Sequence, residues 1–322
     1  MKSPVLGSIV LTLLVLHIST TCHGALPTGF QKGKCGQNDA EAIIRGVVAA
    51  RFRRDPTIVA ALLRMQFHQN RCDASILLDG PSGEKTAPPN LSVRGYDIID
   101  EAKAALEKAC PGVVSCADII VAVTRDAVAL GGGLRYELPL GRRDGKASLA
   151  SNVNLPAPSA TVAQALSAFK GKGLTAAEMV LLLGGHTVGV THCALIMNHL
   201  HNFNGTNKSD PTMNPALLAT LKCRCPRNGA SGNNTINLDQ NLPSANKVDN
   251  SYYNQLILNK GILEIDQKLA LDPATKNLVS AQATGSNFPA LFNNAIIKMS
   301  TIQVLTGMQG EIKKSCRSIN KL

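Results

Sequence analysis

Two basic side chains lie four residues apart in the stretch LLRMQFHQNRCDAS, residues 62–75. Arg64 and His68 would share one face of a helix, because residues i and i+4 are neighbours on a helix surface. An imidazole can accept and return a proton near neutral pH, and a guanidinium stabilises developing negative charge. The pair therefore fits a proton-transfer site, although an exposed basic pair on an ordinary surface helix would leave the same pattern.

A second histidine, His186, lies in the stretch LLLGGHTVG, residues 181–189, between an apolar helix end and a run of small residues. Small neighbours leave room for a large flat group to approach the imidazole, and a histidine that ligates haem iron fits this setting. A core histidine with satisfied hydrogen bonds is the alternative that this motif alone leaves open.

Helical patterns run through most of the chain and would position these side chains, because apolar residues recur at intervals of three and four. Helices are predicted at 38–54, 56–67, 95–110, 115–129, 161–171, 175–183, 190–198, 250–259, 272–280, 287–300 and 306–320. Short strand signals occur near 136–140 and 262–265. No loop has the length or composition of a domain linker, so residues 25–322 are predicted to form one mostly α-helical unit.

The first 24 residues have the pattern of a secretory signal peptide. Lys2 supplies the positive start, residues 5–16 are almost entirely apolar, and small residues near 21–25 offer a cleavage site. The apolar run is too short to span a membrane, and no later stretch reaches about 20 apolar residues. The mature protein, 25–322, is therefore expected to be secreted to the extracellular space or cell wall, with no attachment to a membrane.

The net charge of +11 falls to +10 when Lys2 leaves with the signal, with 32 basic and 22 acidic residues remaining. The cations are scattered singly and in pairs rather than in a dense block, so nucleic acid is not expected as a partner. A secreted basic protein is expected instead to meet an anionic matrix such as a polyuronate cell-wall polysaccharide. A monomer is expected.

Cysteine usage also indicates an oxidising compartment. Once Cys22 leaves with the signal, eight cysteines remain: Cys35, Cys72, Cys110, Cys116, Cys193, Cys223, Cys225 and Cys316. An even count favours disulfides, although spacing alone does not give their connectivity. A zinc site fits less well, because Cys223 and Cys225 have one residue between them where zinc motifs use about two to four.

The two histidine segments and the motifs around them resemble the class III plant secretory peroxidases, from about Gly29 to Asn320. The motifs, in order, are CDASILLD (72–79), EK (84–85) with PN (89–90), RGYDIID (94–100), CPGVVSCADII (110–120), LPLGRRDG (138–145), NLPAP (154–158), GGHTVG (184–189), VDNSYY (248–253), IDQKLALD (265–272) and GEIKKSC (310–316). The resemblance implies a two-lobed helical haem-peroxidase fold with haem b between the lobes. It also implies an enzyme that reduces hydrogen peroxide while oxidising phenolic donors in one-electron steps.

The resemblance assigns roles residue by residue. The resemblance implies that His186 is the axial ligand of the haem iron and that Asp266 accepts a hydrogen bond from the other ring N–H of that histidine. His68 becomes the distal base that moves a proton between the two peroxide oxygens, while Arg64 stabilises the departing oxygen. Asn90 is expected to keep His68 neutral and oriented.

Further roles follow from the same resemblance. Phe67 is expected beside the haem, and Pro156 at the edge where reducing substrates donate electrons. Asn90 also begins an N-glycosylation sequon, which is an alternative role for that residue. Better glycan candidates lie in a polar loop: Asn204, Asn207 and Asn233.

The cysteine pairing that the resemblance implies joins Cys35 to Cys110, Cys116 to Cys316 and Cys193 to Cys225. Cys72 and Cys223 are left without assigned partners.

The chain departs from the family pattern directly after His68. Members have an acidic residue and a cysteine there, whereas this chain continues with Gln69-Asn70-Arg71 and is three residues short. The loss removes a calcium ligand and a partner for Cys72. The remaining distal calcium residues are Asp73, Ser75 and Glu84. They form a poor site for a cation that takes roughly six to eight oxygens.

The proximal calcium site departs less from the family. Thr187, Asp239 and Asp249 match its ligands, but Leu242 lies where a hydroxyl-bearing residue is expected. The loop between the two aspartates is two residues longer than usual. Calcium at this site is an open expectation from the sequence.

The shortened loop raises an alternative function, a catalytically impaired extracellular protein that binds haem or the cell wall. Cleavage of peroxide needs His68 to be placed within about half an ångström, and the loop that follows it is altered.

Overall fold

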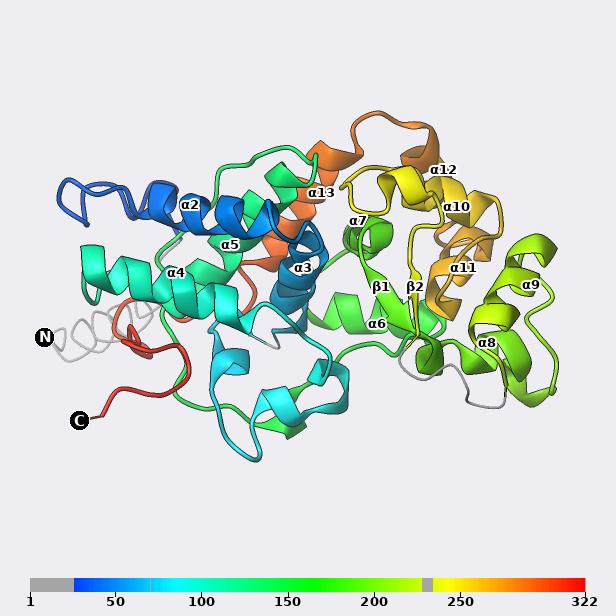
Figure 1. Cartoon of the computed structure of the whole chain (residues 1–322), viewed down its shortest axis with the longest axis horizontal. Coiled ribbons are helices and arrows are strands. Elements are labelled where there is room, and N and C mark those ends of the chain that lie inside the picture. Colours follow the sequence, from blue (N-terminus) through cyan, green and yellow to red (C-terminus); the bar gives the residue numbers. More distant parts are fainter. Residues whose placement is uncertain (1–25, 70, 228–233, 322) are drawn as a thin grey trace, which may run out of the picture.

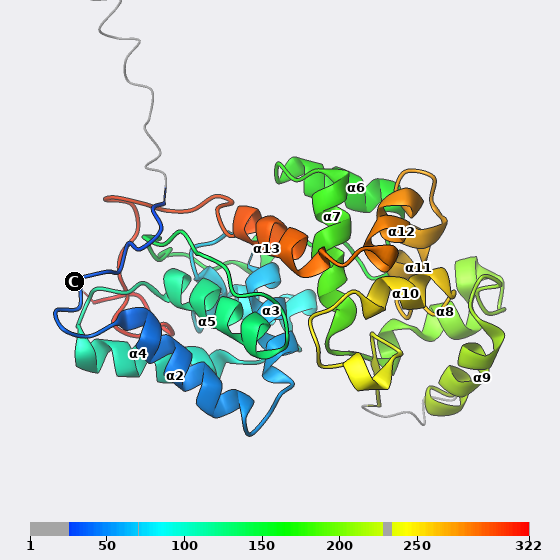
Figure 2. The same cartoon turned by 90° about the horizontal axis from the view of Figure 1, so that it is seen from above.

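The computed structural model describes residues 26–69, 71–227 and 234–321. The predicted signal peptide and Asn233 lie outside these residues. The described chain is mostly helical, as the sequence predicts. Figures 1 and 2 show two lobes side by side, with the C-terminus at the outer end of the first lobe.

Long helices supply the frame of both lobes. The α-helices are α2 (Ala40–Phe52), α3 (Ile58–His68), α4 (Tyr96–Ala109), α5 (Cys116–Leu130), α6 (Val162–Gly171), α7 (Ala176–Leu183), α8 (Met197–His201), α9 (Pro215–Arg224), α10 (Ser251–Ile257), α11 (Glu264–Leu271), α12 (Lys276–Thr284) and α13 (Phe288–Met299). The short 3-10 helices are η1 (Ser75–Leu77), η2 (Glu84–Thr86), η3 (Pro88–Asn90), η4 (Ala150–Asn152), η5 (Gly184–Thr187), η6 (Cys193–Leu195), η7 (Phe203–Gly205) and η8 (Leu242–Ser244).

The first lobe consists of α2 to α5, which pack on one another, and the second contains α6 to α12. Helix α13 lies between them in Figure 2 and packs against α7. Helix α5 is buried from Cys116 to Val128, and its polar residues Asp118, Thr124, Arg125 and Asp126 are buried with its apolar ones. The other first-lobe helices cover it with their apolar faces.

Helix α3 places one face against this core. Its buried residues include Leu62 and Met65, and the Thr124 hydroxyl of α5 donates to the Leu62 carbonyl oxygen at 3.1 Å. Arg64 and His68 fall between the buried positions and are half-buried. The helix ends at His68, because Gln69 adopts an extended backbone conformation.

Helix α7 leads directly to the second histidine. It begins with a reciprocal cap between Thr175 and Glu178, and η5 follows its last residue and carries His186. A side chain at Gly184 would place its Cβ 2.2 Å from the Tyr253 hydroxyl oxygen of α10. Glycine is therefore required for η5 to lie so close to α10.

Five sequence predictions of secondary structure are wrong or displaced, four of them within the body of the fold and one in the C-terminal tail. Residues 190–198 do not form one helix: strand β1 (Val190–His192) pairs antiparallel with β2 (Thr235–Asn237). The strand predicted at 262–265 is replaced by the start of α11. The helix predicted at 272–280 begins later, as α12. The strand predicted at 136–140 is reduced to an isolated bridge between Thr28 and Pro139.

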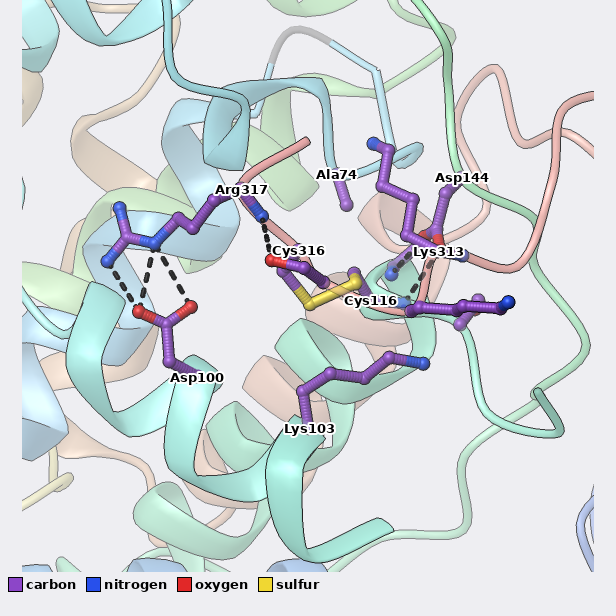
Figure 3. The surroundings of a disulfide bond; sticks show 12 residues. Ala74, Asp100, Lys103, Cys116, Asp144, Lys313, Cys316 and Arg317 are labelled. Atoms are coloured by element: carbon purple, nitrogen blue, oxygen red, sulfur yellow. Dashed lines mark hydrogen bonds and ion pairs between the residues drawn. A yellow bond between two sulfur atoms is a disulfide. The ribbon is translucent and has the colours of Figure 1, made fainter. Parts of the chain in front are cut away.

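The C-terminal tail, predicted as a helix at 306–320, forms turns and isolated bridges instead. Its Cys316 is joined to Cys116 of α5, and Arg317 pairs with Asp100 of α4 at 2.7 Å (Figure 3). The buried Asp144 carboxylate accepts three backbone N–H groups, those of Cys116, Ala117 and Lys313, at 3.1, 2.9 and 2.9 Å. These contacts hold the tail extended against the first lobe.

Three disulfides join the pairs that the resemblance implied: Cys35–Cys110, Cys116–Cys316 and Cys193–Cys225. Cys72 is buried as a free thiol, whereas free Cys223 is exposed on α9. Within the described residues, no helix has the length and apolar character needed to cross a membrane.

Candidate active site

The helix spacing of Arg64 and His68 brings their side chains together. Arg64 Nε lies 3.3 Å from His68 Nε2, so both groups face the same space. The Nη1 and Nη2 atoms of Arg64 also donate hydrogen bonds to backbone carbonyl oxygens, Nη1 to Ser92 at 3.3 Å and Nη2 to Pro89 at 3.1 Å. The guanidinium is therefore fixed by the segment around η3 as well as by its own helix.

His68 is anchored through its other ring nitrogen. Nδ1 lies 2.9 Å from Asn90 Oδ1, and Asn90 Nδ2 donates to the Glu84 carbonyl oxygen at 2.8 Å. Because the Asn90 oxygen can only accept, the proton of the neutral imidazole is on Nδ1 and Nε2 keeps its lone pair. His68 is therefore held through η2 and η3 as well as by helix α3.

Electrostatics favour the neutral form of this histidine. Burial, together with the neighbouring Arg64 guanidinium, lowers the pKa of His68 to about 4. Asn90 is only 2% exposed, with its amide engaged on both sides. Both observations argue against the glycosylation alternative for Asn90 and give no support to the idea that His68 is misplaced.

The second histidine has the same contact with a different partner. His186 Nδ1 lies 2.9 Å from Asp266 Oδ1, and the Tyr252 hydroxyl donates to the same oxygen at 2.8 Å. Burial lowers the pKa of His186, but the Asp266 carboxylate more than offsets it, so the pKa is raised. The structure thus joins residues 80 positions apart that spacing alone could not connect.

The donor chemistry around His186 suits a haem iron. Its side chain is 30% exposed, and its Nε2 has no hydrogen-bond partner among the described residues. Positive charge on His186 or Arg64 lowers the pKa of His68, so the three side chains lie near one another. An imidazole with one nitrogen held by a carboxylate and the other free is the arrangement found at metal-ligating histidines.

Phe67 and Pro156 also come together, since both line a cavity of about 90 Å³. The ring centroid of Phe67 lies 6.2 Å from that of His68 and 6.0 Å from that of Phe169. These contacts place Phe67 beside the distal histidine and Pro156 at the half-buried mouth of the same region.

The residues predicted to bind the proximal calcium lie around the loop between β2 and α10. Thr187 Oγ1 lies 3.3 Å from Asp249 Oδ1 and 3.2 Å from the Lys247 carbonyl oxygen. Asp239 is fully buried. Burial, with a contribution from Asp239, raises the pKa of Asp249, which indicates two carboxylates close together. Such an oxygen-rich group fits calcium.

One further hydroxyl that was not in the sequence prediction lies against this group. Leu242 is 73% exposed and provides no hydroxyl, whereas the Ser244 hydroxyl donates to Asp239 Oδ2 at 2.7 Å. The loop is two residues longer than usual, and Ser244 is two residues beyond Leu242. Counting back from Asp249 instead of forward from Asp239 would have identified it.

The distal calcium residues are close together but already bonded to one another. The Ser75 hydroxyl donates to Glu84 Oε1 at 2.9 Å, and the Ser75 N–H donates to Asp73 Oδ1 at 3.0 Å. Burial raises the pKa of Glu84 to about 7, while the cations of Arg71 and Lys172 act in the opposite direction. These groups fit calcium poorly, because few oxygens are available and positive charge is already nearby.

Cys72, left without its family partner, is not exposed. Its thiol donates to the Met299 carbonyl oxygen at 3.3 Å, and burial raises its pKa to about 11. A buried thiol that is hard to ionise is a poor nucleophile. Cys72 therefore acts as a packing residue here.

Comparison with known proteins identifies the family. The sequence profile of the peroxidase family matches residues 44–285. Peroxidase 60 of Arabidopsis thaliana is 46% identical over 316 residues, which cover 96% of this chain and 95% of the relative. Peroxidase 57 and Peroxidase 44 of the same plant are 45% and 44% identical, and each alignment covers 96% of this chain. The chain therefore belongs to the peroxidase family, among the class III plant peroxidases.

Proposed function

We propose that this peroxidase is a secreted haem b enzyme that reduces hydrogen peroxide to water and takes the two electrons, one at a time, from phenolic donors. The observation that carries the proposal is the orientation of His68. Its Nδ1 faces the Asn90 amide oxygen at 2.9 Å, which leaves Nε2 as a base. Beside it, Arg64 provides a fixed positive charge at 3.3 Å.

Haem held by His186 would supply the redox centre that accepts the oxidising equivalents of peroxide. The role of His68 is to take a proton from one peroxide oxygen at Nε2 and deliver it to the other oxygen, which leaves as water. The low pKa of His68, about 4, keeps Nε2 ready to accept that proton.

Arg64 would stabilise the negative charge that develops on the departing oxygen as the oxygen–oxygen bond breaks. Two carbonyl oxygens, from Pro89 and Ser92, fix its guanidinium. The side chain therefore needs little reorganisation when charge develops.

Asp266 would orient His186 and make its imidazole more electron-rich, because it accepts the Nδ1 proton. The Tyr252 hydroxyl holds the carboxylate in place. Phe67 would pack beside the haem. Donors would deliver electrons near Pro156.

The cofactor content follows from the two calcium sites. We expect one calcium ion, bound in the second lobe by oxygens of Thr187, Asp239, Ser244, Lys247 and Asp249. Asp73, Ser75 and Glu84 are expected to remain without calcium. The positive net charge would favour contact with anionic wall polysaccharide, and Asn204 and Asn207 are glycan candidates in an exposed loop.

The test is guaiacol oxidation by the refolded, haem-loaded protein. Activity should require peroxide and fall on the order of 10²- to 10⁴-fold in His68→Ala, the usual contribution of a positioned acid–base group. His201→Ala is a matched control, because the ring of that histidine, at Nε2, contacts the Cys225 carbonyl oxygen, away from the catalytic residues. Equal activity of His68→Ala and the native protein would contradict the assignment.

A further inference from the structure

A third histidine is buried in the second lobe, outside the site described above. His199 belongs to α8, which lies near α11 in Figures 1 and 2, and it is 1% exposed. Its ring centroid lies 6.0 Å from that of Phe203. Burying a polar ring is costly unless its nitrogen atoms have hydrogen-bond partners. The partners of the two nitrogens therefore decide the state of this histidine.

Both ring nitrogens of His199 face oxygen atoms that accept hydrogen bonds. Nδ1 lies 3.0 Å from the Ile262 carbonyl oxygen, and Nε2 lies 2.9 Å from Asp210 Oδ2. The other carboxylate oxygen, Oδ1, accepts from the N–H and the hydroxyl of Thr212, each at 2.7 Å. A carbonyl oxygen and an ionised carboxylate can only accept. Both ring contacts are therefore hydrogen bonds only when each nitrogen carries a proton, which makes the ring a cation.

Asp210 is the charged group that faces this ring. Of η6, η7 and α9, which pack against α8, only α9 carries charged side chains, Lys222 and Arg224, and both are exposed. His201 of α8 and Arg227 bond to backbone carbonyl oxygens instead. Among the described residues, the second proton on the ring is thus held by one carboxylate and one backbone carbonyl.

The contact with Ile262 is the one that depends on the second proton. A hydrogen bond to a carboxylate is roughly twice as strong as a neutral one, so a ring with a single proton keeps it on Nε2, toward Asp210. Nδ1 then presents a lone pair to the Ile262 carbonyl oxygen, and that hydrogen bond is lost. Loss of the proton would therefore release the backbone at Ile262 while the contact with Asp210 remains.

This backbone lies just ahead of the helix that carries Asp266. Ile262 is fully buried, and α11 begins two residues later without a side-chain cap. An uncapped helix start is held by contacts from outside the helix. Here these include the His199 ring on Ile262 and the Pro158 carbonyl oxygen, which accepts a first-turn N–H of α11 at 3.0 Å. Asp266 is the third residue of this helix, so the contact made by His199 helps to set its position.

We infer that His199, as a doubly protonated ring paired with Asp210, is a positioning residue that acts through Asp266 on His186. The inference rests on the proposed haem ligation by His186, whose Nδ1 lies 2.9 Å from Asp266 Oδ1. When the second proton leaves at alkaline pH, the start of α11 is held less firmly and the hydrogen bond from His186 to Asp266 weakens. The imidazole of His186 then becomes less electron-rich, because its carboxylate partner makes it a more basic ligand.

The experiment measures the iron–histidine stretching vibration of the ferrous haem-loaded protein by resonance Raman spectroscopy, since this vibration reports how strongly His186 binds the iron. In the native protein the frequency should fall as the pH is raised from neutral to alkaline. In His199→Arg the frequency should stay at the native neutral value throughout, because a guanidinium remains charged and has donors for both oxygens. His199→Leu should give the lower frequency at every pH.

The matched control is His201→Leu on the same helix. Its ring contacts the Cys225 carbonyl oxygen and not the segment before α11, so this variant should keep the native response to pH. A purely structural role for His199 would lower the melting temperature of His199→Leu and leave the vibration unchanged. The titration of the native protein decides the inference even where the leucine variant does not fold.

Three results would overturn the inference and leave haem ligation by His186 intact. These are a native frequency that does not change with pH, a response of His199→Arg equal to the native one, and a response abolished in His201→Leu. Absence of the vibration from the native protein would instead contradict ligation by His186, and the inference with it.

Discussion

The two histidines of the site make the same contact and acquire opposite properties. In each, Nδ1 lies 2.9 Å from a side-chain oxygen, of Asn90 for His68 and of Asp266 for His186. The first oxygen belongs to a neutral amide, and the pKa of His68 is lowered to about 4. The second belongs to a carboxylate, and the pKa of His186 is raised. With the same contact geometry, the carboxylate partner raises the pKa of His186, whereas burial and Arg64 lower that of His68 against the weaker effect of its amide partner.

The two histidines also differ in the contacts and cross-links that surround them. On the His186 side, the Tyr252 hydroxyl bonds to Asp266 and the Cys193–Cys225 disulfide is present. On the His68 side, a cross-link and an acidic loop residue are missing, yet Asn90 is still held by the Glu84 carbonyl oxygen. The contact that orients the ring of His68 is thus present even though the loop after it is shortened.

The largest effect, a loss of haem affinity, is expected when the carboxylate of Asp266 is removed. In Asp266→Asn the partner of His186 becomes neutral, and loss of such a partner typically costs about 10- to 100-fold in metal affinity. Haem transfer to apomyoglobin would measure this. Tyr252→Phe removes only the hydroxyl and should have a smaller effect. Equal haem retention in all three proteins would mean that Asp266 does not act through His186.

The next effect concerns pH. The reaction with peroxide should be level from about pH 7 to about pH 5, because His68 stays neutral above its pKa of about 4, and should fall below that value. In Asn90→Asp a carboxylate would raise the pKa of His68, so the fall should begin at higher pH. Stopped-flow rates across pH test both. An unchanged profile in Asn90→Asp would show that the amide charge is irrelevant.

A smaller effect is expected from calcium removal, which should act on the second lobe. Chelation should lower the melting temperature by on the order of 5 °C, as expected for loss of a ligand present at about 100 times its dissociation constant. Asp239→Asn should abolish the chelator response, whereas Asp73→Asn should leave it intact. Metal analysis should give one calcium per chain, and a count of two would contradict the poor fit of the distal residues.

The smallest effect should come from repairing the short loop. Replacing Gln69-Asn70-Arg71 with the acidic, cysteine-bearing loop of the family would give Cys72 a partner and add about 2 kcal/mol of stability. The rate with peroxide should stay the same, because His68 is already held by Asn90. A large rise in rate would instead show that the loop controls the histidine.

Much of this structure could be predicted from sequence, and the failures have physical causes. Amphipathic helices such as α3 and α4 can be predicted from their own apolar spacing. Strand β1 does not, because its pairing with β2 depends on residues more than forty positions away. The tail from 306 has a helical apolar pattern, but the disulfide of Cys316 and the backbone bonds of Asp144 hold it extended.

Some residues of the site could likewise be predicted from the sequence, and others could not. Helical spacing alone joined Arg64 to His68, whereas Asp266 could be linked to His186 only through the family motifs. Ser244 was missed because the loop was counted from the wrong aspartate. The cavity could not be foreseen, since it depends on where three helices end in space.

The fixing of the tail has a consequence for how the chain is made. The Lys313 N–H is one of the three backbone donors to buried Asp144. Cys116 can form its disulfide only once Cys316 has been synthesised. Both partners are synthesised long after the residues they bind, Lys313 169 positions after Asp144 and Cys316 200 positions after Cys116. The first lobe, although its helices are synthesised first, is therefore completed last, so an early stop codon that removes only this end would damage the half of the enzyme that carries His68.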